Sequence, residues 1–178
     1  MDPLQIITKY YTPGSELYEI LVDHSKDVAR LALEFASRRS DLNIDTDFVY
    51  QAAMLHDIGI FKTDAAGIAC HGSFPYICHG YLGADLMRAE GLDRHALVCE
   101  RHTGLGLSLD YIVNNDLPLP HRDMRPVSVE EQLICFADKF FSKSHLGVQR
   151  TPEVARQKLM KFGDVSNFDR WMKMFVDL

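Results

Sequence analysis

A histidine and an aspartate stand side by side at positions 56 and 57, directly after the apolar run from Phe48 to Leu55. A carboxylate buried there costs on the order of several kcal/mol unless a positive group compensates it. A metal ion is a natural compensation, because imidazole and carboxylate groups are both metal ligands. Gly59 is expected to end the helix in a left-handed cap, which leaves His56 and Asp57 at a helix end.

Two more polar residues interrupt apolar helical patterns. His24 occupies an inward position of its helix and, taken alone, is better explained as a core histidine with one hydrogen bond. Asp138 follows Ile134-Cys-Phe-Ala137, and Lys139 beside it is expected to be a poor partner, because adjacent helical residues do not face each other. A mixed nitrogen and oxygen set suits Mn, Fe, Zn, Co or Ni, and here it comprises His24, His56, Asp57 and Asp138.

Two further histidines lie at helix boundaries. His79 begins one expected helix, and His102 ends another. A single histidine near a helix end is unremarkable, since a C-terminal one interacts favourably with the helix dipole. Two of them, each beside an apolar helix, predict a second metal site next to the first.

The six residues follow one another along the chain in the order His24, His56, Asp57, His79, His102 and Asp138. This order resembles that of the ligands of the HD superfamily of metal-dependent phosphohydrolases, and His56-Asp-Ile-Gly59 resembles its HDIG variant. The resemblance extends from about residue 15 to residue 145. It implies an all-α fold, a single-domain HD-type helical bundle over residues 1–178, and a C-terminal helical extension over about 147–178.

The same resemblance implies the roles of individual residues. His24, His56, Asp57 and Asp138 would be the primary metal ligands, while His79 and His102 would serve a second ion bridged by Asp57. The set is similar to that of dinuclear members such as the HD-type diadenosine-tetraphosphate hydrolases. The expected cofactor is therefore a pair of divalent transition-metal ions, Fe or Mn before Zn, Co, Ni or Mg. His56 and Asp57 are the expected catalytic residues, with Asp57 orienting the attacking water.

Positively charged residues near this set are candidates for substrate binding. The candidates are Arg101, Arg122, Arg125, Ser142 and Lys62, with Lys139 and Lys143 expected to share one helix with Ser142. Ile60 and Phe61 separate Lys62 from the motif, whereas many HDIG members continue directly with lysine. The chain also lacks the paired histidines and the Gly-Tyr-Pro motif of the cyclic-di-GMP phosphodiesterases, which argues against a cyclic-di-GMP substrate.

Three functions remain open at this stage. The first is a hydrolase that cleaves a phosphoester or phosphoanhydride of a nucleotide-like small molecule through a metal-activated water. The second is a di-iron oxygenase that uses the same ligands. The third is a non-catalytic module that binds a nucleotide or a metal ion.

Helical patterns account for most of the chain. Apolar residues at three- and four-residue spacings predict helices over about 15–38, 45–58, 79–90 and 93–102. Ser128-Val-Glu-Glu131 is a capping box that starts a helix expected to continue through Phe141. Thr151-Pro152 starts another helix, and the last is expected over 167–176. Residues 104–126 are expected to form a loop.

Composition limits the partners and the location. The 178 residues carry a net charge of -6, which disfavours a large nucleic-acid interface because such interfaces are basic. No apolar stretch reaches the roughly 20 residues of a membrane span. The first residues lack the pattern of a signal peptide, so we expect a cytoplasmic protein. The four cysteines lack C-x-x-C spacing and are expected to be buried free thiols.

Overall fold

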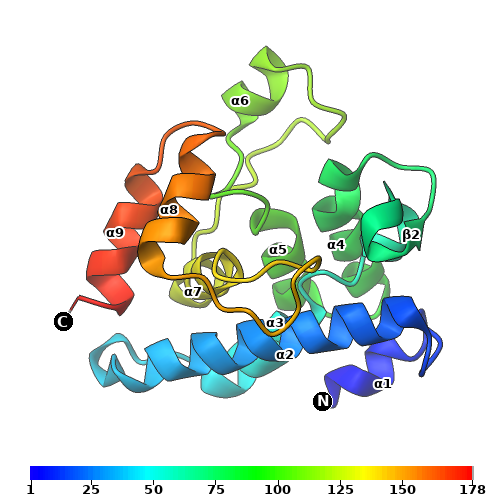
Figure 1. The fold of residues 1–178 in the computed structure, drawn as a ribbon, viewed down its shortest axis with the longest axis horizontal. Coiled ribbons are helices and arrows are strands. Elements are labelled where there is room, and N and C mark those ends of the chain that lie inside the picture. Colours follow the sequence, from blue (N-terminus) through cyan, green and yellow to red (C-terminus); the bar gives the residue numbers. More distant parts are fainter. Residues whose placement is uncertain (178) are drawn as a thin grey trace.

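The longest helix, α2 (Glu16–Ser37), runs along one edge of the molecule in the computed structural model, which describes residues 1–177 (Figure 1). The Ser15 hydroxyl accepts a hydrogen bond from the Tyr18 backbone N–H at 3.2 Å and caps the helix. The apolar residues of α2 point into the core together with His24. The predicted first helix is confirmed. Residue 178 lies outside the described residues.

Helices α3 (Thr46–Leu55) and α7 (Val129–Asp138) pack against the buried face of α2. Asp45 caps α3, accepting from the Phe48 N–H at 3.1 Å. Ser128 caps α7 in the same way, accepting from the Glu131 N–H at 3.1 Å. Both predicted helix starts are confirmed, because a short polar side chain satisfies an otherwise unpaired N–H at each end.

Both helices end earlier than predicted. α3 stops at Leu55 instead of 58, and α7 stops at Asp138 instead of Phe141. Beyond these points the backbone tightens: the Ile58 N–H donates to the Leu55 carbonyl and the Phe141 N–H to the Asp138 carbonyl, three residues back. The metal-type residues of α3 and α7 therefore lie at helix ends.

Helices α4 (His79–Ala89) and α5 (Asp93–Arg101) form an antiparallel pair beside α3, joined through Gly91 at φ +74°. The predicted left-handed cap at Gly59 is wrong, since its φ is -82°. Gly59 is required for a different reason. A Cβ there would lie 2.2 Å from the His79 carbonyl oxygen and 2.5 Å from the Gly83 nitrogen. The absent side chain lets α4 approach the end of α3.

Short elements fill the connections. β1 (Asp64–Ala65) and β2 (Cys70–His71) form one antiparallel pair, with Asp64 opposite His71. α6 (Leu109–Asn114) lies in the segment expected to be a loop and projects from the bundle at the top of Figure 1. Six residues are too few for a helical periodicity to show. α1 (Pro3–Ile7) was likewise not predicted and packs on α3.

The C-terminal helices α8 (Pro152–Met160) and α9 (Ser166–Phe175) confirm the two predicted helices of this region. Thr151 caps α8, as its Thr-Pro pattern predicted. α9 buries its aromatic residues against the Phe136 ring of α7, and these residues are Phe168, Trp171 and Phe175.

Two expectations from composition concern the described part of the chain. All four cysteines are buried and free there, as predicted. Residues 1–177 contain no helix that combines the length and the hydrophobicity required to cross a bilayer.

Candidate metal centre

His56 and Asp57 leave the end of α3 and enter the centre of the molecule, where both are fully buried. The His56 Nδ1 lies 2.6 Å from the Ala53 carbonyl oxygen. A carbonyl can only accept, so Nδ1 carries the hydrogen and Nε2 faces the cluster. The end of α3 thus fixes both the position and the tautomer of this imidazole.

Two other histidines are oriented by the same device. The Nδ1 of His79 lies 2.6 Å from the Tyr76 carbonyl, and the Nδ1 of His102 lies 2.7 Å from the Cys99 carbonyl. Each acceptor stands three residues before its histidine, as Ala53 stands before His56. Backbone support on one ring nitrogen, with the other directed inward, is the usual arrangement around metal-binding histidines.

The first group of ligand-type side chains joins three helices. The Nε2 of His24 lies 3.0 Å from Asp138 Oδ1 and 3.3 Å from Asp57 Oδ2. The Nε2 of His56 lies 3.0 Å from Asp57 Oδ2 and 3.3 Å from Asp138 Oδ1. One ligand atom from each of the four residues lies within 4.8 Å of the others.

The second group shares Asp57 with the first. Asp57 Oδ1 lies 3.3 Å from His79 Nε2 and 3.1 Å from His102 Nε2, while Oδ2 faces His24 and His56. These three residues also have ligand atoms within 4.8 Å of one another. The two oxygens of one carboxylate therefore face two separate groups, which is the geometry of a bridging ligand.

The donor set fits cations rather than a hydrogen-bonded polar core. His79 Nε2 and His102 Nε2 lie 3.0 Å apart, although the carbonyl contacts of both rings place the hydrogens on Nδ1. Two bare nitrogen lone pairs at that distance repel unless a positive charge lies near them. Asp57 Oδ2 is buried and makes no hydrogen bond of good geometry, and its charge is met by the Lys143 ammonium at 2.8 Å. The residues present can therefore hold divalent metal ions, in keeping with their nitrogen and oxygen chemistry.

Protonation within the cluster is uneven. Burial lowers the pKa of His56, but Asp57 and Asp138 outweigh it and raise that pKa to about 10. Burial raises the pKa of Asp57, yet His56 and Lys143 hold it well below its usual range. Burial lowers the pKa of His102 to about 4, so this imidazole is neutral at physiological pH. A metal ion that binds the first group must displace a proton from His56.

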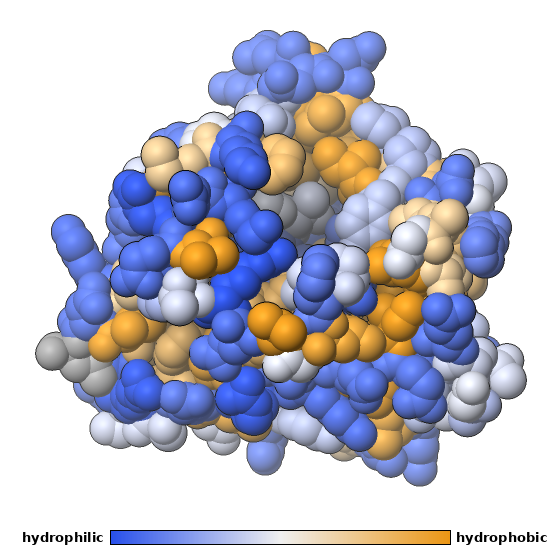
Figure 2. Space-filling view, viewed as in Figure 1, coloured by the Kyte–Doolittle hydropathy of each residue, from blue (hydrophilic) through white to orange (hydrophobic). Residues whose placement is uncertain are grey.

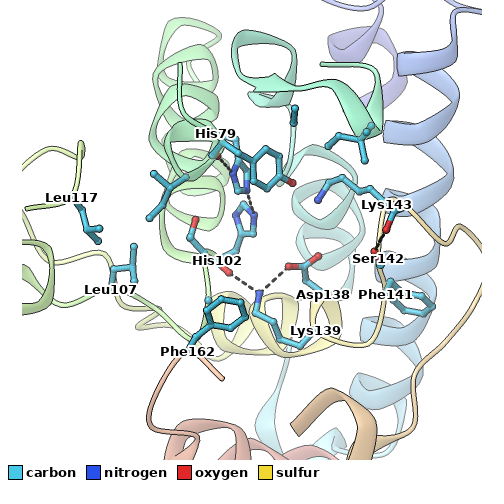
Figure 3. A pocket seen from close by; sticks show the side chains of 18 of the residues that line it. His79, His102, Leu107, Leu117, Asp138, Lys139, Phe141, Ser142, Lys143 and Phe162 are labelled. Carbon is cyan, nitrogen blue, oxygen red and sulfur yellow. Dashed lines mark hydrogen bonds and ion pairs between the residues drawn. The ribbon is translucent and has the colours of Figure 1, made fainter. Parts of the chain in front are cut away.

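Two lysines contact the cluster from the segment after α7. Lys139 Nζ lies 2.8 Å from Asp138 Oδ2 and 2.8 Å from the His102 carbonyl oxygen (Figure 3). The expectation that Lys139 is a poor partner is wrong, because its flexible side chain turns toward the adjacent Asp138 carboxylate and ends between that group and the His102 carbonyl. Lys143 Nζ reaches Asp57 Oδ2 at 2.8 Å.

The sequence suggested Lys143 only as one cation of a continuing helix. Its contact with Asp57 depends on the turn after Asp138, which directs the chain back over the cluster. The run of Lys139, Ser142 and Lys143 directly after a buried aspartate was the available signal.

A cavity of about 710 Å³ opens onto the cluster. His79, His102 and Asp138 border it, together with Lys139, Ser142 and Lys143 (Figure 3). Hydrophobic residues border the hollow below α6 in Figure 2. Of the predicted substrate-binding residues, Ser142 is the one that the structure places at this cavity.

The other predicted substrate-binding residues lie elsewhere. Arg101 pairs with the buried Glu131 at 2.9 Å, and Arg122 pairs with the buried Glu100. Arg125 Nε pairs with Asp123 Oδ1 at 3.0 Å on the surface. Lys62 Nζ lies 6.0 Å from the centre of the Phe61 ring. The residues that border the cavity do not include Lys62 or these three arginines.

Comparison with known proteins gives one family match. The family model described as HD domain matches residues 21–142, which contain all six residues of the cluster. No solved structure matches the chain.

Several curated proteins are similar in sequence. The chain is 32% identical over 157 residues to a Thermoplasma volcanium protein named tRNA (cytidine(56)-2'-O)-methyltransferase, covering 87% of this chain and 40% of that one. It is 33% identical over 123 residues to an uncharacterized protein of Methanocaldococcus jannaschii, covering 67% and 65% of the two chains. A Picrophilus torridus protein with the same methyltransferase name is 28% identical over 129 residues, with 72% and 33% covered. The chain thus spans less than two thirds of each of these relatives.

Proposed function

This chain belongs to the HD domain family, and from that premise we propose that it is a metal-dependent phosphohydrolase acting on a nucleotide-like small molecule. The reaction is the cleavage of a phosphoester or phosphoanhydride by water. The observation that carries the proposal is the division of the cluster into two groups that share Asp57. Two ligand groups on one carboxylate suit two-metal hydrolysis of phosphate esters.

The chain would hold one ion with His24, His56, Asp57 and Asp138, and a second with Asp57, His79 and His102. Mn or Fe is the favoured metal, because mixed imidazole and carboxylate ligands suit first-row transition metals. Such ions lower the pKa of a bound water and neutralise charge on the phosphoryl oxygens. The remaining contributions come from the side chains.

The side chains contribute orientation and charge. The carbonyls of Ala53, Tyr76 and Cys99 hold three imidazoles in the tautomer that directs Nε2 inward. Lys139 remains with Asp138 and fixes that carboxylate. Lys143, with its ammonium at the border of the cavity, is placed to donate to a phosphoryl oxygen. Burial of Asp57 keeps bulk water away from the bridge.

The methyltransferase name of two relatives is carried by longer chains, of which this chain spans 40% and 33%. Methyl transfer is not part of the proposal for the matched part, whose inward side chains form the candidate metal centre. A cytoplasmic location and a small phosphorylated substrate belong to the same proposal.

The test combines metal analysis with phosphate release. The purified protein is analysed for bound metals and is then assayed with Mn²⁺ or Fe²⁺ against a panel of nucleotides. Phosphate release that requires the metal and falls at least about 100-fold, on the order expected for a lost catalytic centre, in His56→Ala and Asp57→Asn supports the proposal. Asp64→Asn, an exposed aspartate, is the matched control.

Undiminished hydrolysis in both variants would overturn the assignment. Oxygen consumption by the iron-loaded protein without phosphate release would instead favour the oxygenase. Tight nucleotide binding without turnover in any metal would favour the non-catalytic module.

A further inference from the structure

The cavity beside the metal cluster has two chemically different sides. Its inner end is polar and is formed by His79, His102 and Asp138 with Lys139 and Lys143. The rest is largely apolar, and its apolar residues include Ile68, Leu107, Tyr111, Leu117, Phe141 and Phe162. A ligand that fills the cavity would thus place a charged end at the cluster and an apolar end against these residues.

Cationic side chains at this cavity are few. Of the described residues that border it, Lys139, Lys143 and Arg150 are the lysines and arginines. Lys139 is held by Asp138 and the His102 carbonyl, and Arg150 donates to the Lys139 carbonyl at 3.3 Å. Lys143 is also paired, since its Nζ lies 2.8 Å from Asp57 Oδ2, the carboxylate shared by the two groups of the cluster. This supply of positive charge suits one phosphate group, because each added phosphate brings further negative charge that needs a partner.

Two aromatic rings at the cavity are unusually exposed. Phe162 keeps 80% of its surface exposed and Tyr111 keeps 44%, although both border the cavity. Phe162 lies in the turn between α8 and α9, beyond the part of the chain that matches the family. Tyr111 lies in α6, which projects from the bundle (Figure 1). The two rings come from segments that contribute no residue to the metal cluster.

The close-up places the α6 side of the cavity opposite Lys143. Leu107 and Leu117, which flank α6, lie across His79 and His102 from Lys143, whereas Phe162 is drawn on the side of Lys139 (Figure 3). A flat apolar group attached to a phosphate at the cluster would therefore meet leucine and aromatic side chains. Aromatic contacts add stabilisation beyond simple burial, which favours a planar group over an aliphatic chain.

We propose that Phe162 and Tyr111, with Leu107 and Leu117, form an apolar clamp that selects a phosphomonoester whose leaving group carries a single planar aromatic ring. The inference rests on the proposed phosphohydrolase function and defines its substrate class. Nucleoside monophosphates fit the clamp, whereas nucleoside triphosphates and phosphates without an aromatic group do not. No residue of the clamp is a metal ligand, so its effect falls on substrate selection.

The test compares substrates that differ in one part. The metal-loaded protein is assayed with the four ribonucleoside 5'-monophosphates, with ribose 5-phosphate, which keeps the ester but lacks the base, and with the matching triphosphates. We expect kcat/KM to be about tenfold or more higher for the best monophosphate than for ribose 5-phosphate, since stacking of one base contributes about that much. The triphosphates should be poorer substrates than the monophosphates.

Variants of Phe162 test whether its ring causes the preference for nucleoside monophosphates. Phe162→Ala is expected to raise KM for the nucleoside monophosphate about tenfold, with ribose 5-phosphate unchanged. Phe162→Leu keeps an apolar side chain without a ring and should give an intermediate loss. Val154→Ala changes another exposed apolar residue of the same region that does not border the cavity, and it should leave both substrates unaffected.

Equal kcat/KM for ribose 5-phosphate and the nucleotides would overturn the clamp, as would an equal loss for both substrates in Phe162→Ala. A preference for triphosphates would overturn the single-phosphate class. If no ester is hydrolysed, the proposed function fails, and the clamp is judged by binding alone. Adenosine 5'-monophosphate binding, measured by ligand-observed NMR, must then weaken in Phe162→Ala and not in Val154→Ala; an unchanged affinity would refute it.

Discussion

The Nε2 atoms of His79 and His102 lie 3.0 Å apart, while the Nδ1 atoms of both rings are held by backbone carbonyls. Neither ring can turn its protonated nitrogen toward the other without losing its carbonyl contact. The pair is therefore arranged for a shared cation, and it adjoins Oδ1 of Asp57. In the proposed function, this pair would hold the second metal ion apart from the first.

Removing His102 should remove one ion and keep the other. His102→Ala is expected to reduce bound metal from about two ions per chain to about one, because His24, His56, Asp57 and Asp138 remain. Inductively coupled plasma mass spectrometry after loading and desalting measures the ratio. An unchanged metal content would contradict the second position. His95→Ala, a histidine outside both groups, is the control.

Replacing Lys143 should change metal affinity and turnover in opposite directions. Lys143→Met removes an ammonium 2.8 Å from Asp57 Oδ2, so repulsion between that charge and an entering cation disappears. We expect the metal Kd to fall several-fold and kcat to fall about tenfold or more, since the donor to the phosphoryl oxygen is lost. Metal titration by calorimetry and steady-state assays measure the two effects.

The control for that experiment is Lys62→Met, because Lys62 does not border the cavity. A Lys143 variant with weaker metal binding and normal kcat would show that the lysine supports the fold of the cluster and does not contact the substrate.

Gly59 should tolerate no side chain. In Gly59→Ala the new Cβ would lie 2.2 Å from the His79 carbonyl oxygen, so the ends of α3 and α4 must separate. A loss of about 2–4 kcal/mol in the free energy of unfolding is expected, as for other overpacked buried sites. Gly67→Ala is the matched control, because a Cβ at Gly67 would meet no atom within 4 Å and the φ of Gly67 is not positive. Urea unfolding followed by circular dichroism compares the two variants.

Asp45 should contribute a pH-dependent part of the stability of α3. The Phe48 N–H and Arg94 hold the pKa of Asp45 below its usual range. A lowered folded-state pKa means that the contribution is present above the unfolded pKa of about 4 and is lost as the pH falls through the folded value. Asp45→Ala is expected to cost about 1 kcal/mol at about pH 7, with a smaller difference from wild type below about pH 4.

Asp45→Asn separates the cap from the charge. Asparagine caps helices as well as aspartate does, so this variant should retain most of the stability at about pH 7 and lose the pH dependence. Thermal unfolding between about pH 3 and pH 8 measures both effects. A constant difference between Asp45→Ala and wild type across that range would contradict the prediction.

The sequence determined the longer helices and the residue types that form the cluster. Ser128 and Thr151 begin helices where their side chains predicted, because capping is a local interaction that depends on neighbouring residues. The six metal-type residues could be selected because polar groups on apolar helix faces require compensation. The family match over residues 21–142 agrees with that selection.

Local patterns failed where the cause lies far along the chain. The role of Gly59 depends on the approach of His79 and Gly83, and the turn after α7 brings Lys143 to Asp57. Arginines that looked suitable for phosphate are paired with carboxylates brought from other segments, as Arg101 is with Glu131. Charge partners of this kind depend on packing, which no local spacing encodes.

The sequence by itself thus determined which side chains can hold a metal, because residue type and helical period are local properties. Only the tertiary structure decided that Asp57 directs one oxygen to each group and that Phe162 borders the same cavity. In the sequence, Phe162 is an apolar residue among polar ones, and this pattern does not indicate a position at the cavity. Its position at the cavity follows from the packing of α9 on α7, which brings the end of the chain back to the histidines.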